Sequence, residues 1–175
     1  MKKLAICAAA VATLLVCGAS AQQDKNPWAK FNKGSYAKLK SSTVMSIAGN
    51  KNTMTTESKT TLLDKTADKV VVETETSVMG TVQKNKVEIP LKAAAPAKPV
   101  ANAPAPKIGS ETITVAGKSF SCKTYEIVTD VNGSKSTSKS WIAEEVPGGV
   151  VKTVISTKGA MNSETTMELV DYKAM

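Results

Sequence analysis

Apolar and polar residues alternate over much of this chain. Over residues 36–47, alanine, leucine, methionine and isoleucine alternate with lysine and serine, and over residues 70–78 valine alternates with glutamate. A period of two is typical of a β-strand with one buried face. Segments of this kind, rich in serine, threonine and valine, are predicted as strands at residues 35–48, 53–64, 70–79, 84–90, 111–116, 119–130, 135–143, 150–157 and 163–172.

Short turn sequences separate these predicted strands. Asn132-Gly133 is the strongest of them, because both residues tolerate the positive φ that a two-residue hairpin demands. Connections this short join antiparallel neighbours. Strands of about 12 to 14 residues, at about 3.3 Å each, span roughly 40 to 45 Å, and long twisted strands curl. The sequence therefore predicts a mainly β fold, a single curved antiparallel sheet or half-barrel meander of about nine strands.

Residues 53–61 depart from the alternating pattern. Serine and threonine fall on both faces of this segment, at Thr55, Thr56, Ser58, Thr60 and Thr61. A strand without a clear apolar face has a weakly specified register. We expect this strand at an edge or a wet rim of the sheet.

One segment near the beginning of the chain predicts a helix. Asn26 can cap it, Pro27 suits its first position and Gly34 can end it, with Trp28 and Phe31 three residues apart on one face. We expect one short N-terminal helix across the open side of the curled sheet. Its two aromatic side chains then either plug one end of the core or form a lid over a ligand.

A Pro/Ala-rich segment divides the chain at residues 92–109. Prolines and alanines supply few backbone donors for a sheet and bury no large side chain, which predicts a disordered, extended loop. Each flank is too small and too poor in large apolar residues for an independent core. We therefore expect both flanks to share one sheet in a single β domain over residues 22–175.

The first 21 residues predict export. Lys2 and Lys3 precede an apolar run over residues 4–16, and Ala19-Ser20-Ala21 resembles a signal-peptidase cleavage site. A signal peptide over residues 1–21, cleaved after Ala21, leaves a periplasmic or secreted protein with no transmembrane segment. The alternative is a lipoprotein acylated on Cys17, because Leu14-Leu15-Val16-Cys17 resembles a lipobox.

The mature chain offers few groups for catalysis. Cys122 is its one thiol, and the sequence has no histidine to act as its base. Glu144 and Glu145 are adjacent, so on a strand they would point to opposite faces. No cluster of ligating residues has metal-site spacing, and no glycine-rich loop precedes a helix. We expect no catalytic residue, no metal, no cofactor and no enzymatic activity.

Two binding functions remain. Without residues 1–21 the chain has 21 lysines and 15 carboxylates, a net charge of +6. The lysines are scattered along the chain, and the sequence has no arginine, the residue best suited to forked phosphate contacts. The first interpretation is a lipid or another amphiphile held in the concave face of the sheet. The alternative is an anionic polymer bound through the scattered lysines; nucleic acid is not expected. The residues predicted to line an amphiphile site, or else to fill the core, are Trp28, Phe31, Leu39, Met45, Ile47 and Trp141.

The stretch from Trp141 to Lys152 carries a resemblance. Its Trp-x(4)-Val-Pro-Gly-Gly-Val-Val-Lys element, together with residues 26–31 and 123–126, resembles a family of uncharacterised exported bacterial proteins. The arrangement is remotely similar to the lipoprotein-carrier superfamily (LolA/LolB-like), whose fold is a curved antiparallel sheet closed by helices around a hydrophobic cavity. This resemblance implies an exported half-barrel and another envelope component or a lipid as partner. The Val-Pro-Gly-Gly turn itself predicts that residues 150–155 return to pair with Trp141 and Ile142.

Overall fold

The computed structural model of this protein describes residues 26–47, 50–78, 80–92, 104–131, 133–159 and 162–175. These residues form one open antiparallel sheet of nine strands, which confirms the predicted fold class. Each predicted strand is present, with boundaries shifted by a few residues. The strands are β1 (Tyr36–Ile47), β2 (Asn50–Lys65), β3 (Lys69–Val78), β4 (Thr81–Pro90), β5 (Lys107–Val115), β6 (Lys118–Val131), β7 (Ser134–Ile142), β8 (Val150–Lys158) and β9 (Asn162–Lys173).

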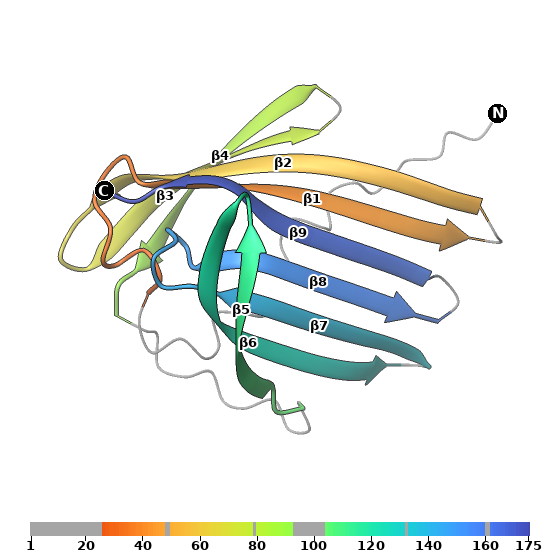
Figure 1. Ribbon diagram of the computed structural model, residues 1–175. Coiled ribbons are helices and arrows are strands. Elements are labelled where there is room, and N and C mark those ends of the chain that lie inside the picture. Colours follow the sequence, from red (N-terminus) through yellow and green to blue (C-terminus); the bar gives the residue numbers. More distant parts are fainter. Residues whose placement is uncertain (1–25, 48–49, 79, 93–103, 132, 160–161) are drawn as a thin grey trace.

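The strand order is β4-β3-β2-β1-β9-β8-β7-β6-β5 (Figure 1). The two flanks of the Pro/Ala-rich segment share this sheet, because the first strand pairs with the last. The expected edge position of residues 53–61 is wrong, since β2 lies between β1 and β3 and the edges are β4 and β5. Neighbours on both sides explain the hydroxyls of β2: Thr60 and Thr74, for example, bond to each other at 2.9 Å.

The two edge strands, β4 and β5, stand on either side of the Pro/Ala-rich segment in the chain. Residues 93–103 of the expected loop lie outside the described residues. The strand β5 already begins at Lys107, so the last three residues of the expected loop belong to the sheet.

The expected N-terminal helix is absent from the described residues, which place two successive turns there. Ala29 N–H donates to Asn26 O at 3.0 Å, and Phe31 N–H donates to Trp28 O at 3.1 Å. The amides of the following residues leave this pattern: Asn32 N–H donates to Met175 O, and Gly34 N–H donates to Leu62 O, both at 2.9 Å. The ends of β2 and of the chain therefore take the donors that a helix would have needed. Asn26 Oδ1 accepts from the Trp28 amide at 2.9 Å, so the residue expected to cap the helix closes an Asx turn instead.

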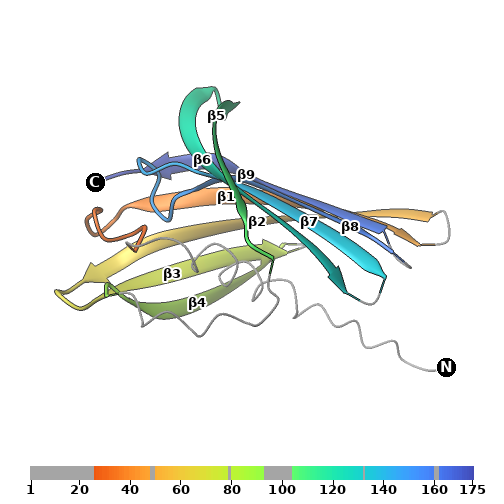
Figure 2. The same ribbon diagram turned by 90° about the horizontal axis from the view of Figure 1, so that it is seen from below.

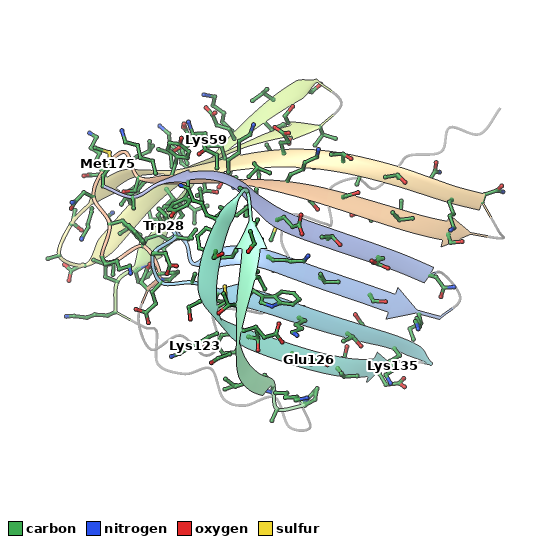
Figure 3. The ribbon with its side chains drawn as sticks, viewed as in Figure 1. Trp28, Lys59, Lys123, Glu126, Lys135 and Met175 are labelled. Atoms are coloured by element: carbon green, nitrogen blue, oxygen red, sulfur yellow. The ribbon has the colours of Figure 1, made fainter. Side chains whose placement is uncertain are left out.

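Two buried clusters hold the fold together. In the first, Trp28 and Phe31 pack against Leu62, Val70 and Val72 of β2 and β3. The second lies where β1, β5, β6, β8 and β9 meet the turn between β7 and β8, and consists of Ala37, Val115, Phe120, Cys122, Ala143, Val146, Val151 and Leu169. Figure 3 places Trp28 and Met175 at one end of the sheet and Lys135 at the other. Both clusters lie toward the Trp28 end, so the opposite half of the sheet contains neither.

The Val-Pro-Gly-Gly turn connects the two clusters. Gly148 and Gly149 both have φ of 80°, a conformation that favours glycine. A Cβ on Gly148 would lie 2.9 Å from Cζ2 of Trp28, so the indole ring packs directly against this backbone. The predicted return of the chain is confirmed, because Trp141 pairs with Lys152 and Ile142 with Val150.

Candidate functional site

The strand register assigns side chains to two faces of the sheet. Residues opposite each other on paired strands project to the same side. We call one side the Leu39 face, because Leu39 lies opposite Leu169 and Ser58. The other side is the Trp141 face, because Trp141 lies opposite Lys152. The assignment covers β1–β4, β7–β9 and β6 from Lys123 onward; the hairpin β5–β6 crosses in front of β7–β9 (Figures 1 and 2).

The two faces differ in charge. In the described residues of these strands the Leu39 face has no carboxylate, and its two lysines, Lys65 and Lys123, lie at the ends of paired regions. The Lys65 ammonium group donates to the Phe31 carbonyl at 3.3 Å, beneath the N-terminal turns. Five of the six ion pairs of the described residues join two residues of the Trp141 face: Lys38–Glu57, Lys69–Glu88, Lys84–Glu75, Lys86–Glu73 and Lys152–Glu168. In the sixth, Lys139 of this face pairs with Glu111 of β5.

Hydroxyl groups form cross-strand pairs on the Leu39 face. The bonded oxygens are 2.9 to 3.2 Å apart, and the residues of each pair are directly opposite in the register. These pairs are Thr43–Thr165, Thr60–Thr74, Ser136–Thr157 and Ser140–Thr153. Each hydroxyl keeps further acceptor or donor capacity for a partner outside the sheet. The face is therefore polar without being charged.

Aliphatic side chains lie between these hydroxyl pairs. Met45 is 38% exposed, and Met54, Ile127 and Ile155 are half-buried. One row across six strands contains Ile127, Ser138, Ile155, Thr165, Thr43 and Met54. Five strand spacings of about 4.8 Å make this row roughly 24 Å long. The row contains three aliphatic side chains and three hydroxyls.

The residues predicted to line a ligand site do not converge. Trp28 and Phe31 belong to the buried cluster on β2 and β3, where they are 6% and 4% exposed. Leu39 and Met45 share the Leu39 face, whereas Trp141 lies on the opposite face. Ile47 ends β1, and its side chain lies outside the described residues, as do Cys17 and Ala21. Trp28 and Phe31 cover the end of the Leu39 face formed by Leu62, Val70 and Val72. Leu39 and Trp141 both pack against the second cluster, and Met45 is exposed on the Leu39 face.

Trp141 is fixed by charged neighbours on its own face. Its indole Nε1–H donates to Glu111 Oε2 at 2.7 Å, and the Lys139 ammonium group lies 2.6 Å from Glu111 Oε1. The Nζ atoms of Lys139 and Lys152 lie 4.7 and 5.9 Å from the ring centre. Hydrogen bonds from Lys139 and then Trp141 lower the pKa of Glu111. Every charge in this cluster thus has a partner within the protein.

Two cavities of the described residues are small. A polar pocket of about 140 Å³ lies between Ser110, Thr124, Glu126 and Lys139, and one of about 60 Å³ lies beside Phe120. Small-molecule pockets usually enclose about 300 to 1,000 Å³, so neither of these two cavities can enclose an acyl chain.

The residues considered for catalysis are a buried cysteine and two exposed glutamates. Cys122 is 2% exposed, and burial raises the pKa of its thiol. Glu144 and Glu145 are exposed in the turn before Val146. No set of three or more histidine, cysteine, aspartate or glutamate residues in the described ranges is arranged to hold a metal ion. The same ranges contain no helix with the length and apolar character needed to cross a bilayer.

Comparisons with known proteins support the fold. No protein-family model and no curated protein matches the sequence. A "putative lipoprotein" from Parabacteroides distasonis superimposes with a TM-score of 0.50 and 12% identity, covering 87% of this chain and 100% of that one. At this identity the likeness shows the fold alone.

Two further solved structures score far lower. A LolA superfamily protein from Nitrosomonas europaea has a TM-score of 0.22 and 7% identity, over 86% of this chain and 90% of that one. A "putative outer membrane lipoprotein-sorting protein domain" from Vibrio parahaemolyticus has a TM-score of 0.22 and 9% identity, over 82% and 86%. Superpositions with these TM-scores do not establish a common fold.

Proposed function

We propose that this protein is an exported, non-enzymatic binding protein of the cell envelope that holds an uncharged or zwitterionic amphiphile on its Leu39 face. The observation that carries this proposal is the absence of carboxylates from that face, whose two lysines lie at the ends of paired regions. Aliphatic side chains and paired hydroxyls occupy the rest. Such a surface suits a ligand with a hydrocarbon chain and a polar, uncharged end.

The physical basis is the cost of removing groups from water. Removing a charged group from water costs free energy even when the group is paired, whereas covering apolar surface gains about 25 cal/mol per Å². On the Trp141 face a ligand would have to cover ion pairs such as Lys152–Glu168, which join at 2.7 Å. On the Leu39 face it would cover Met45, Met54 and Ile155 and could bond to the hydroxyls beside them. The same ligand is therefore expected to prefer the Leu39 face.

Sequence features and fold support an envelope location. The first 21 residues have the composition of an export signal. The fold is shared with the Parabacteroides protein whose description is a lipoprotein. Cleavage after Ala21 gives a free periplasmic or secreted carrier, and acylation of Cys17 gives a tethered one. The intact mass of the protein purified from a bacterial envelope fraction distinguishes the two products.

Binding of a neutral monoacylglycerol tests the ligand proposal. We expect native mass spectrometry to show a complex with the purified protein, and Met45→Lys and Ile155→Lys each to weaken it at least about tenfold, about 1.4 kcal/mol. The matched controls are Val44→Lys and Val154→Lys, which lie next to them on the Trp141 face. Unchanged binding by the controls and loss in the Leu39-face variants supports the proposal.

Two outcomes would contradict it. Equal loss in all four variants would show a general effect of added charge, not a site on one face. Retention of an anionic polysaccharide that declines steeply with salt, without monoacylglycerol binding, would favour the lysine-mediated alternative. The ion pairs of the Trp141 face count against that alternative, because carboxylates already neutralise many of its lysines.

A further inference from the structure

The outer side of the edge strand β4 faces no described strand, and at its end Asn26 Nδ2 donates to the Pro90 carbonyl at 2.9 Å. This strand pairs with β3 and has no second neighbour among the described strands. Its residues are exposed except for the half-buried Ile89, and Val82 and Val87 are 58% and 45% exposed. An edge strand presents a row of unpaired backbone donors and acceptors, which another strand can use. A long, exposed edge with apolar residues is therefore a site of association.

Charged residues that usually protect an edge are engaged with the neighbouring strand here. Lys84 pairs with Glu75, and Lys86 lies 3.7 Å from Glu73. Glu88 lies 2.7 Å from Lys69. Lysines blunt an edge because an approaching strand would have to accept an unpaired charge. Here each charge of β4 already has a partner on β3, so this protection is weakened.

We propose that β4 pairs antiparallel with β4 of a second copy of this chain, in the register that sets Val87 opposite Val87 of the second copy. A two-fold axis then sets Lys86 of each copy opposite Glu88 of the other. A register centred on Lys86 forms two Lys84–Glu88 pairs but also sets Lys86 opposite Lys86. A register centred on Glu88 sets Glu88 opposite Glu88 and forms no complementary pair. Like charges in directly opposite positions destabilise a strand pair. Charge complementarity thus selects the register centred on Val87.

This pairing keeps the two faces of the sheet distinct. The two-fold axis is perpendicular to the sheet at the joined strands, so both Leu39 faces lie on one side of the dimer. On the other side, charges of alternating sign form a row across the two copies. In one copy Glu73 pairs with Lys86, which lies opposite Glu88 of the second copy, and that Glu88 pairs with Lys69 of its own copy. The dimer does not depend on the proposed ligand, and its test is separate from the binding test.

Sedimentation of the purified protein over a range of concentrations tests this proposal. We expect a reversible dimer. Lys86→Glu and Glu88→Lys should each weaken it at least about tenfold, since each creates two repulsive pairs. An equimolar mixture of the two single variants should dimerise again, because every opposite pair is then Lys with Glu. Lys51→Glu, with the same change in charge on β2, is the matched control and should leave the dimer unchanged.

Several results would overturn the proposal. A protein that stays monomeric up to about 1 mM has no such interface of useful strength. Dimers that survive both single variants, or that fail to return in the mixture, would exclude this register. Circular dichroism of each variant checks that the sheet is intact. If Lys86→Glu does not fold, the exposed Val87→Asp at the dyad is the second variant, and loss of its dimer is then the expected result.

Discussion

The indole Nε1–H of Trp141 reaches Glu111 Oε2 at 2.7 Å, although these residues lie on β7 and β5 with β6 between them. Thr124, which lies opposite Trp141 on β6, is buried beneath them at 5% exposure. This hydrogen bond and the Lys139–Glu111 ion pair therefore link the edge strand β5 to β7 across β6.

Acid should weaken this edge. Glu111 has a lowered pKa because Lys139 and Trp141 donate hydrogen bonds to its carboxylate. A lowered pKa in the folded state contributes stability above the unfolded value, and that contribution is lost as the pH falls through the folded value. We expect Glu111→Gln to be less stable than the natural protein at pH 7, with the difference vanishing in the acid range. Urea unfolding at several pH values measures this, and a difference that is constant with pH would contradict it.

Gly148 should be the most sensitive glycine in the fold. Alanine there must adopt a φ of 80° and also place its Cβ 2.9 Å from the Trp28 ring. Gly133 has a φ of 75° with no neighbour within 4 Å, so Gly133→Ala is the matched control. We expect about 1 kcal/mol for the control and at least about 2 kcal/mol more for Gly148→Ala. Equal losses in thermal unfolding would mean that the indole does not pack on this turn.

The N-terminal turns should contribute much of the stability of β2 and β3. Phe31 is 4% exposed and packs with Leu62, Val70 and Val72. We expect Phe31→Ala to cost about 3 to 5 kcal/mol, the usual cost of deleting a buried aromatic ring. Amide hydrogen exchange should then increase more in β2 and β3 than in β7 and β8. Uniform exchange across the sheet would count against this separate cluster.

The thiol of Cys122 should be unreactive in the folded protein. It is buried, its pKa is raised by burial, and it donates to the Phe120 carbonyl with Sγ and O 3.7 Å apart. The thiolate is the reactive form, so a thiol reagent at neutral pH should modify Cys122 only after unfolding. Rapid labelling of folded protein, detected by mass, would show that the second cluster opens readily.

The sequence predicts the strands well because strand formation here is local. The period of two and the turn residues, such as Asn132-Gly133, act over a few residues, and the nine predicted strands agree with those observed. The pairing of β1 with β9 could not be derived in this way, because it joins residues more than one hundred positions apart, such as Tyr36 and Lys173. The edge position expected for β2 is wrong for the same reason. Its serine and threonine residues indicate a polar environment but do not indicate which strands pair with it.

The candidate face was partly visible in the sequence. Alternation in β1 and β3 separates apolar from charged residues within each strand. It does not show which set of positions in one strand lies on the same face of the sheet as a given set in another strand. The register decides this, and three irregularities alter it, between Lys38 and Leu39, Leu62 and Asp64, and Trp141 and Ile142. Without the second of them, the position of Lys65 on the Leu39 face cannot be derived. The signal that sequence reasoning missed is that, in strand after strand, charged residues occur in only one of the two alternating sets of positions.

The pairing of the first strand with the last also has a consequence for folding. Residues 36–90 and residues 107–173 each form a local meander, in which every strand pairs with its neighbour in sequence. The β1–β9 ladder is the one strand pairing that closes a long loop, and such closures slow folding. A circular permutant that joins residue 175 to residue 26 and opens in the Pro/Ala-rich segment would convert this step into a hairpin. It should reach the same sheet with faster refolding, since all eight pairings would then be local.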